Sequence, residues 1–242
     1  MKHPKAQIIA QLQREILPLQ GLKHRVQEAT RMTGLNMMAD HFPNQCFPLG
    51  AVHEFFCQRA EDLSATSGFV AGILSSLMQD GGVTLWISRS PLVFPPALVH
   101  FGITPHNIIF LHLQKETEML WAVEEALKCN CLAAVVGEIS ELSFTASRRF
   151  QIAVESSGVT CLLLRYQPSK TTTAAVARWR IQSLPSPVEE GLPGVGFPRW
   201  QVALLKIRNG RPGSWPLEWA GNGFKLSYPA LSVASSHFRK TG

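Results

Sequence analysis

Side chains that commonly do chemistry are present in this sequence, but they form no recognisable catalytic set. The 8 histidines are scattered, and none stands in the HxxxH or HExxH spacing of a helical zinc site. We interpret His53 and Glu54 as a packing pair at the end of an apolar segment rather than as an acid–base pair. The 5 cysteines include the close pair Cys129 and Cys131 but no CxxC motif, which indicates reduced thiols. We therefore predict no catalytic residue, no metal site and no cofactor.

Tryptophan and arginine gather in the last third of the chain. Four of the 6 tryptophans lie there, each close in sequence to an arginine. Such a cluster is typical either of a core of aromatic rings covered by guanidinium groups or of a protein interface rich in hot-spot residues. The sequence leaves both interpretations open. The residues that would form a partner interface are Arg199, Trp200, Arg211, Trp215 and Trp219.

The formal net charge of +6 is unevenly distributed. From Arg165 onward there are eleven basic and three acidic residues, whereas the preceding part of the chain carries a small acidic excess. The basic third could face a polyanion or could simply be a solvated surface. No apolar run reaches the roughly 18 residues of a membrane span, and the first residues lack the apolar centre of a signal peptide. We therefore expect a cytoplasmic protein that does not enter a membrane.

The elements that would position these residues alternate between apolar strands and amphipathic helices. We expect strands at 51–56, 83–87, 108–113, 132–136 and 159–164, and helices at 66–78, 117–128 and 144–157. Strands that are apolar on both faces and alternate with helices indicate a mainly parallel sheet flanked by helices. The fold class is therefore α/β.

The two ends of the chain follow different patterns. Residues 177–183 and 200–207 alternate in polarity, and Asn209-Gly210 then leads into 214–219, which predicts an antiparallel C-terminal hairpin. We divide the chain into an N-terminal amphipathic helix (1–20), a core domain (21–226) and a flexible tail (227–242). The N-terminal helix would support self-association through the apolar side chains of Ile8, Ile9, Leu12 and Ile16.

Several motifs resemble known proteins. The segment from Pro48 to Phe56, Pro-Leu-Gly-Ala-Val-His-Glu-Phe-Phe, resembles the strand that enters the phosphate loop of RecA recombinases, and the similarity continues over residues 46–226. Three stretches are more specific: Val52-His53-Glu54, the run from Leu142 to Arg149, and Arg208-Asn209-Gly210-Arg211-Pro212-Gly213-Ser214-Trp215 with Glu218-Trp219. On these stretches the chain resembles the ImuA family, RecA-like proteins of bacterial mutagenic repair cassettes. The resemblance implies a RecA-like core.

An ATPase of this fold needs glycines that let backbone N–H groups approach the phosphates, a lysine, and a Ser or Thr for magnesium. The resemblance places the corresponding loop at 58–68, and its degenerate phosphate-loop residues are Ser64, Ala65, Thr66, Ser67 and Gly68. Thr66 stands at the lysine position, and no lysine occurs between Lys23 and Lys115.

Two further catalytic positions are also changed. Gly137 stands where the magnesium-site aspartate is expected, with Glu138 one place late, and Ser90 stands where the water-activating glutamate is expected. Together with the missing lysine, these changes remove charge neutralisation, metal positioning and activation of the nucleophile. We therefore expect a protein that is not an enzyme.

The resemblance also indicates where DNA would lie. RecA-type proteins hold single-stranded DNA with two loops near the carboxyl end of the sheet, and the second corresponds to 165–174 here. The candidate DNA contacts are Tyr166, Lys170, Thr171, Thr172 and Arg178. The first loop is shortened, because only residues 142–145 separate a buried strand from the next helix. Contact with single-stranded DNA is therefore expected to be weak.

The resemblance implies that the partner is ImuB, a polymerase-like protein without catalysis of its own, and through it a DnaE-type polymerase. Our hypothesis is a self-associating, non-catalytic scaffold in SOS-induced, error-prone translesion DNA synthesis. One rival is a divergent RecA-like ATPase. A second is a SulA-like cell-division inhibitor, although SulA-like chains are shorter and lack the Arg-Pro-Gly-Ser-Trp hairpin.

Overall fold

A computed structural model describes residues 35–79, 81–166, 171–186, 196–221 and 223–227. Within these residues the chain builds one 9-stranded sheet in the order β3-β2-β4-β5-β1-β6-β7-β8-β9. The strands are β1 Val52–Cys57, β2 Val83–Ser88, β3 Ile108–His112, β4 Leu132–Glu138, β5 Thr160–Tyr166, β6 Ala177–Leu184, β7 Arg199–Ile207, β8 Gly213–Trp219 and β9 Phe224–Leu226. The helices are α3 Ala60–Leu77, α4 Glu116–Leu127 and α5 Phe144–Ser157, with 3-10 turns η1 Asn36–His41, η2 Pro43–Gln45, η3 Pro95–Phe101 and η4 Pro105–Asn107.

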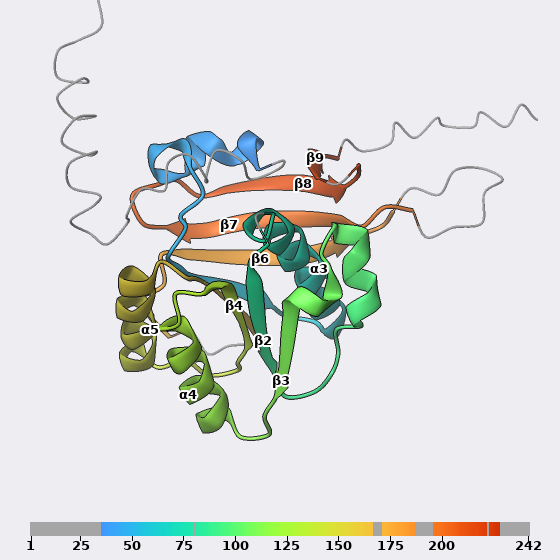
Figure 1. Cartoon of the computed structure of the whole chain (residues 1–242). Helices are drawn as coiled ribbons and strands as arrows, with labels where there is room; N and C mark the ends of the chain where they lie inside the picture. Colours follow the sequence, from blue (N-terminus) through green and yellow to red (C-terminus); the bar gives the residue numbers. More distant parts are fainter. Residues whose placement is uncertain (1–34, 80, 167–170, 187–195, 222, 228–242) are drawn as a thin grey trace, which may run out of the picture.

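The first six strands of the sheet order, β3 to β6, pair in parallel. Their sequences are apolar because helices cover both faces: α4 and α5 pack on β1, β2, β4 and β5, and α3 packs on the opposite face. Figure 1 shows α4 and α5 together beside this parallel half. The predicted α/β class with a mainly parallel sheet is confirmed.

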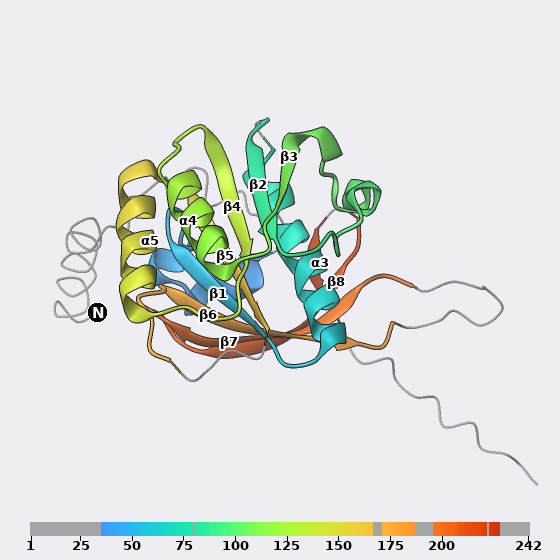
Figure 2. The ribbon, with the colours of Figure 1, turned by 90° about the horizontal axis from the view of Figure 1, so that it is seen from below.

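The strands β6 to β9 pair antiparallel and extend the same sheet. Figure 2 shows β6 and β7 continuing across the molecule beyond β1. Along β6, Ala177, Trp179 and Ile181 are buried and the side chains between them are half-buried, as expected for a strand whose two faces differ in cover. In β7 the alternation is less regular, because the residues 202–204 are all buried and a register shift lies opposite Arg178 and Trp179. The predicted C-terminal hairpin is thus formed by β7 and β8.

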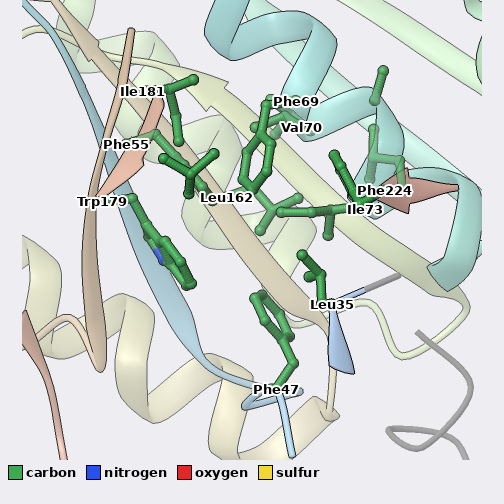
Figure 3. Close-up of a cluster of buried hydrophobic side chains, with 14 of the residues drawn as sticks. Leu35, Phe47, Phe55, Phe69, Val70, Ile73, Leu162, Trp179, Ile181 and Phe224 are labelled. Carbon is green, nitrogen blue, oxygen red and sulfur yellow. The ribbon is translucent and has the colours of Figure 1, made fainter. Parts of the chain in front are cut away.

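The main core lies between the sheet and α3. Phe55 of β1, Phe69 of α3 and Trp179 of β6 are all fully buried there, and the rings of Phe55 and Trp179 stack with centroids 6.0 Å apart. Figure 3 shows these rings with Phe47 and Phe224, which come from opposite ends of the described chain. A second apolar cluster fills the space between the sheet and the helices α4 and α5.

Some boundaries differ from the sequence-based expectation. Helix α3 begins at Ala60 rather than at residue 66, and β9 was not predicted. The proposed N-terminal helix with Ile8, Ile9, Leu12 and Ile16 lies outside the described residues, as does the proposed tail (227–242) apart from Ser227. Ser227 is buried, and its N–H donates to the carbonyl oxygen of Pro216 at 2.9 Å, so the chain is still held in place where the tail was expected to begin. Among the helices that are described, none has the length and apolar character required to cross a membrane.

Candidate functional site

The connection between β1 and α3 is where a phosphate-binding loop would be expected, and it is very short. Only Gln58 and Arg59 separate the last residue of β1 from the first residue of α3. Helix formation starts early because Glu61 and Asp62 place carboxylates in the first turn, where the helix dipole favours negative charge. Asp62 also caps the helix start, because its carboxylate accepts from the backbone N–H of Arg59, the residue before α3.

Asp62 occupies the N-terminus of α3 with its own carboxylate. Its Oδ2 accepts hydrogen bonds from the backbone N–H of Arg59 at 3.3 Å and from Arg59 Nε at 3.2 Å. Its Oδ1 accepts from Arg59 Nη2 at 3.1 Å and from the backbone N–H of Ser183 at 3.4 Å. The side chain of Asp62 is 1% exposed, and the hydrogen bond from Arg59 lowers its pKa. A helix N-terminus that could bind an anion therefore already holds one from the chain itself.

The five predicted loop residues, 64–68, lie in the second and third turns of α3 and not in a loop, which corrects the expectation. Thr66, at the presumed lysine position, is fully buried. Its hydroxyl donates to the carbonyl oxygen of Asp62 at 2.6 Å and accepts from Cys57 Sγ at 3.3 Å. Gly68 faces Phe101 and Trp200 at contact distance. These side chains attach α3 to β1 and to the core.

The presumed magnesium-site position is enclosed as well. A Cβ atom at Gly137 would lie 3.0 Å from Val123 and 3.2 Å from Leu163, so a larger side chain there would displace the core. The neighbouring Glu138 is directed to Trp86, whose Nε1 donates to the Glu138 carboxylate at 2.7 Å. Burial raises the pKa of Glu138. No three potential metal ligands from the described residues gather at one place.

A buried charge cluster lies at the junction of the parallel and antiparallel halves. Glu54 of β1 is fully buried between two arginines, with Arg165 Nη1 of β5 at 3.2 Å and Arg178 Nε of β6 at 3.0 Å. Both guanidinium groups also lie over the ring of Phe56, at 5.9 and 5.8 Å from its centroid. Arg165 Nη2 donates to the carbonyl oxygen of Ser140 at 3.2 Å.

The structure brings some of the predicted DNA contacts together. Arg178 Nη2 donates to the carbonyl oxygen of Thr171 and to the Thr173 hydroxyl, both at 2.9 Å. Thr171 and Thr172 are exposed, and Tyr166 at the end of β5 is 41% exposed. Lys170 lies outside the described residues. Arg178 is only 20% exposed and is held by Glu54, so part of its charge is already neutralised.

The proposed partner interface divides into buried and exposed residues. Trp200 and Trp219 are 1% and 4% exposed, and their rings pack in T-shaped contacts against Phe224 at 5.8 and 5.0 Å. These two tryptophans are therefore core residues, and the prediction that they form part of a partner interface is wrong for them. Arg199 pairs with Glu218 at 3.8 Å and is 12% exposed. Arg211 is exposed, whereas Trp215 is half-buried and packs against the main core.

The hairpin motif makes a contact that sequence reasoning missed. His41 of η1 lies against the β7–β8 turn: its Nδ1 donates to the carbonyl oxygen of Pro212 at 2.9 Å, and its backbone carbonyl accepts from the N–H of Arg211 at 3.0 Å. Its ring packs edge-on against Trp215 with centroids 4.8 Å apart. Gly210 is required because a Cβ atom there would collide with the carbonyl oxygen of His41. The residue spacing contained no signal for this pairing, because it joins segments 170 residues apart.

The comparisons with known proteins decide the family. The protein ImuA from each of two strains of Caulobacter vibrioides is 34% identical to this chain over 190 residues, which covers 73% of this chain and 78% of the relative. The chain belongs to the ImuA family. No family model matches this ImuA-family chain.

The RadB recombinase, whose crystal structure is known, shares the fold of this ImuA-family chain. It superposes with a TM-score of 0.53 at 10% sequence identity, over 74% of this chain and 92% of RadB. This likeness confirms the RecA-like architecture. The short β1–α3 connection and the Asp62 cap are therefore features of a RecA-like core in an ImuA-family protein.

Proposed function

We propose that the chain is a non-catalytic, RecA-like accessory protein of SOS-induced, error-prone translesion DNA synthesis, and that it binds an ImuB-like protein and through it a DnaE-type polymerase. The observation that carries the non-catalytic part is the buried carboxylate of Asp62, which accepts from the backbone N–H groups of Arg59 and Ser183 and places a negative charge at the start of α3, where a phosphate group would have to bind. Membership of the ImuA family supports the repair role.

The nucleotide part of this proposal is tested with magnesium and ATP. A ligand that binds only the folded state raises the melting temperature. We expect no such rise with Mg-ATP and no phosphate release above a protein-free blank. Mg-ATP stabilisation together with turnover that Thr66→Ala abolishes would instead establish the divergent ATPase.

The partner is proposed to dock on the surface of the β7–β8 hairpin near Arg211 and Trp215. Arg211 is exposed there and Trp215 is half-buried, and hydrogen bonds with His41 hold the turn in place. A charge reversal, Arg211→Glu, is expected to weaken co-purification with an ImuB-like protein by about tenfold, because exposed arginines at interfaces contribute strongly to affinity. The matched control is Arg148→Glu, an exposed position on α5. Equal binding by both variants would contradict the docking site.

Self-association through the N-terminal stripe (Ile8, Ile9, Leu12, Ile16) stays a proposal. Replacing Ile9 and Leu12 together by Ser is expected to shift the chain to a monomer in analytical ultracentrifugation, because the apolar stripe would be interrupted. A SulA-like role is distinguished by a separate observation: overexpression would make cells filament, which we do not expect of a translesion scaffold.

A further inference from the structure

None of the helices in the described residues packs on one face of the antiparallel strands β6 to β9. Trp179 of β6, Val202 of β7 and Leu217 of β8 point into the core beside α3. Since neighbouring residues of a strand point to opposite faces, the residues next to each of them point to the other face of the sheet. Helices α4 and α5 pack mainly on β1, β2, β4 and β5. Figure 1 shows them beside the parallel half, whereas β7 and β8 lie at the opposite side of the sheet. We call the surface formed by the outward residues of β6 to β9 the open sheet face.

The open sheet face is strongly basic. Five cations from β6, β7 and β9 lie on it, together with one carboxylate, Glu218 of β8. The cations are Arg178, Arg180, Arg199, Lys206 and Lys225. Their strand register places Arg178 directly opposite Lys206, and places Glu218 between Arg199 and Lys225.

Three of these cations have no carboxylate partner among the described residues: Arg180, Lys206 and Lys225. Lys206 and Lys225 are exposed, and Arg180 is half-buried. The Nε atom of Arg180 is buried without any hydrogen-bond partner in the described part of the chain. The unpartnered guanidinium N–H of Arg180 costs free energy that a bound anion would offset.

The other outward residues are suited to an extended polyanion. Gln182, Gln201 and Ser214 add neutral hydrogen-bonding groups between the cations. Neighbouring strands lie about 4.8 Å apart, so the cations form a flat array rather than a single pocket. A flat face cannot enter the major groove of a duplex, which needs a projecting helix or ribbon. A single strand can lie on it with its phosphates next to the cations.

We propose that the open sheet face binds the sugar–phosphate backbone of single-stranded nucleic acid. This surface is distinct from the carboxyl-edge loop that holds Thr171 and Thr172, and it is independent of the proposed ImuB-like partner, because the chain alone carries every group involved. The cations neutralise phosphates and release counterions, so binding weakens as salt rises.

The test is a fluorescence anisotropy titration of the full chain with a labelled oligothymidylate at several salt concentrations. The test variant replaces Arg180, Lys206 and Lys225 by Gln together. We expect it to bind about tenfold or more weakly at low salt, and the slope of log K against log salt to fall in magnitude by about 2, since each phosphate contact to a single strand contributes about 0.7.

The matched control replaces Arg89, Lys115 and Lys128 by Gln, which removes the same charge from positions outside the open sheet face. We expect this control to lose much less affinity, and circular dichroism checks that both variants fold. Equal loss in both variants, or no loss in the test variant, would overturn the proposal. Equally strong binding of poly-glutamate would also overturn it, in favour of an acidic protein segment. A negative result in this titration would not contradict the proposed ImuB-like partnership, which is tested separately by co-purification.

Discussion

Gly68 and Gly72 stand four residues apart in α3 but have different surroundings. A Cβ atom at Gly68 would meet Phe101 and Trp200 at 3.5 Å, an ordinary contact distance. At Gly72 it would collide with the buried ring of Phe224 and lie 3.0 Å from Trp219. Gly72 is therefore required by the close approach of β8 and β9, whereas Gly68 is a helix residue with room for a methyl group.

Gly68→Ala is expected to stabilise the chain by up to about 1 kcal/mol, because alanine has a higher helix propensity than glycine. Gly72→Ala is expected to destabilise it by about 1–3 kcal/mol through overpacking. Urea denaturation of the two variants measures both effects. A Gly68→Ala variant less stable than Gly72→Ala would mean that residues 64–68 do not form the helix described here.

His53 is a buried, neutral histidine with a defined tautomer. The indole N–H of Trp179 can only donate, so Nδ1 of His53 accepts this bond at 3.3 Å. Nε2 therefore carries the proton and donates to the carbonyl oxygen of Pro48 at 2.7 Å. Burial lowers the pKa of His53 from 6.5 to about 4. Its role is to pack, with its ring stacked on Phe47 at 4.4 Å.

This pKa makes stability depend on pH. Between pH 6.5 and about 4 the unfolded chain binds a proton at His53 that the folded chain does not, so the free energy of unfolding decreases as the pH is lowered. We expect a loss of about 3 kcal/mol over this window. His53→Gln keeps a hydrogen-bond donor and does not titrate, so its stability should fall less from pH 7 to pH 4.5 in urea denaturation. Parallel decreases in both proteins would exclude His53 as the cause.

At the scale of elements, the β7–β8 hairpin and η1 form one unit. The most specific sequence motif of the chain, Arg208 to Trp215, supplies Gly210 and Gly213, whose lack of a Cβ leaves room for His41 and for the ring of Trp215. Asn209 adopts the left-handed conformation at φ 58°, which asparagine tolerates better than most residues. The glycines of the motif are thus explained by the close approach of the hairpin to the backbone of His41. The same turn places Arg211 at the surface.

Gly210→Ala is expected to destabilise the chain by about 1–3 kcal/mol and to displace η1, because the added methyl group collides with the backbone of His41. Hydrogen exchange at the N–H of Arg211, which bonds to His41, should speed up in the variant. His41→Ala is the complementary change and should produce the same local effect without overpacking. Unchanged exchange in both variants would show that the hairpin holds its position without η1.

At the scale of the whole molecule, Glu54 joins the two halves of the sheet. It lies on β1, which pairs in parallel with β5 on one side and with β6 on the other. Its carboxylate bridges Arg165 from β5 and Arg178 from β6. A carboxylate this deeply buried is tolerated because two guanidinium groups compensate it.

Glu54→Gln is expected to cost about 3 kcal/mol, because it leaves the fully buried Arg165 without a countercharge. Glu218→Gln is the matched control: it removes a carboxylate from the looser pair with Arg199, at 3.8 Å, and should cost under about 1 kcal/mol. Thermal or urea denaturation compares the two. Equal costs would mean that the junction is held by apolar packing alone.

Local patterns in the sequence determined the elements. Helix α5 runs over 144–157 as predicted, since Ser143 caps its start by accepting from the N–H of Ala146, and Gly158 ends it in the left-handed conformation. The early start of α3 was missed because the residue before the helix is Arg59 rather than the usual Ser, Thr, Asp or Asn, and the capping carboxylate comes from Asp62 inside the first turn. The sequence motifs likewise predicted the ImuA family and the RecA-like fold, and the comparisons with known proteins confirm both.

Only the tertiary structure decided which surfaces exist. The strand order places β1 between β5 and β6, and this brings Glu54 to Arg165, more than 100 residues away. The same arrangement buries Trp200 and Trp219, and none of the described helices α3, α4 and α5 covers the outward side chains of β6 to β9. The alternation of apolar and polar residues predicts that a strand has two different faces. Which of these faces is covered depends on where helices from other parts of the chain pack.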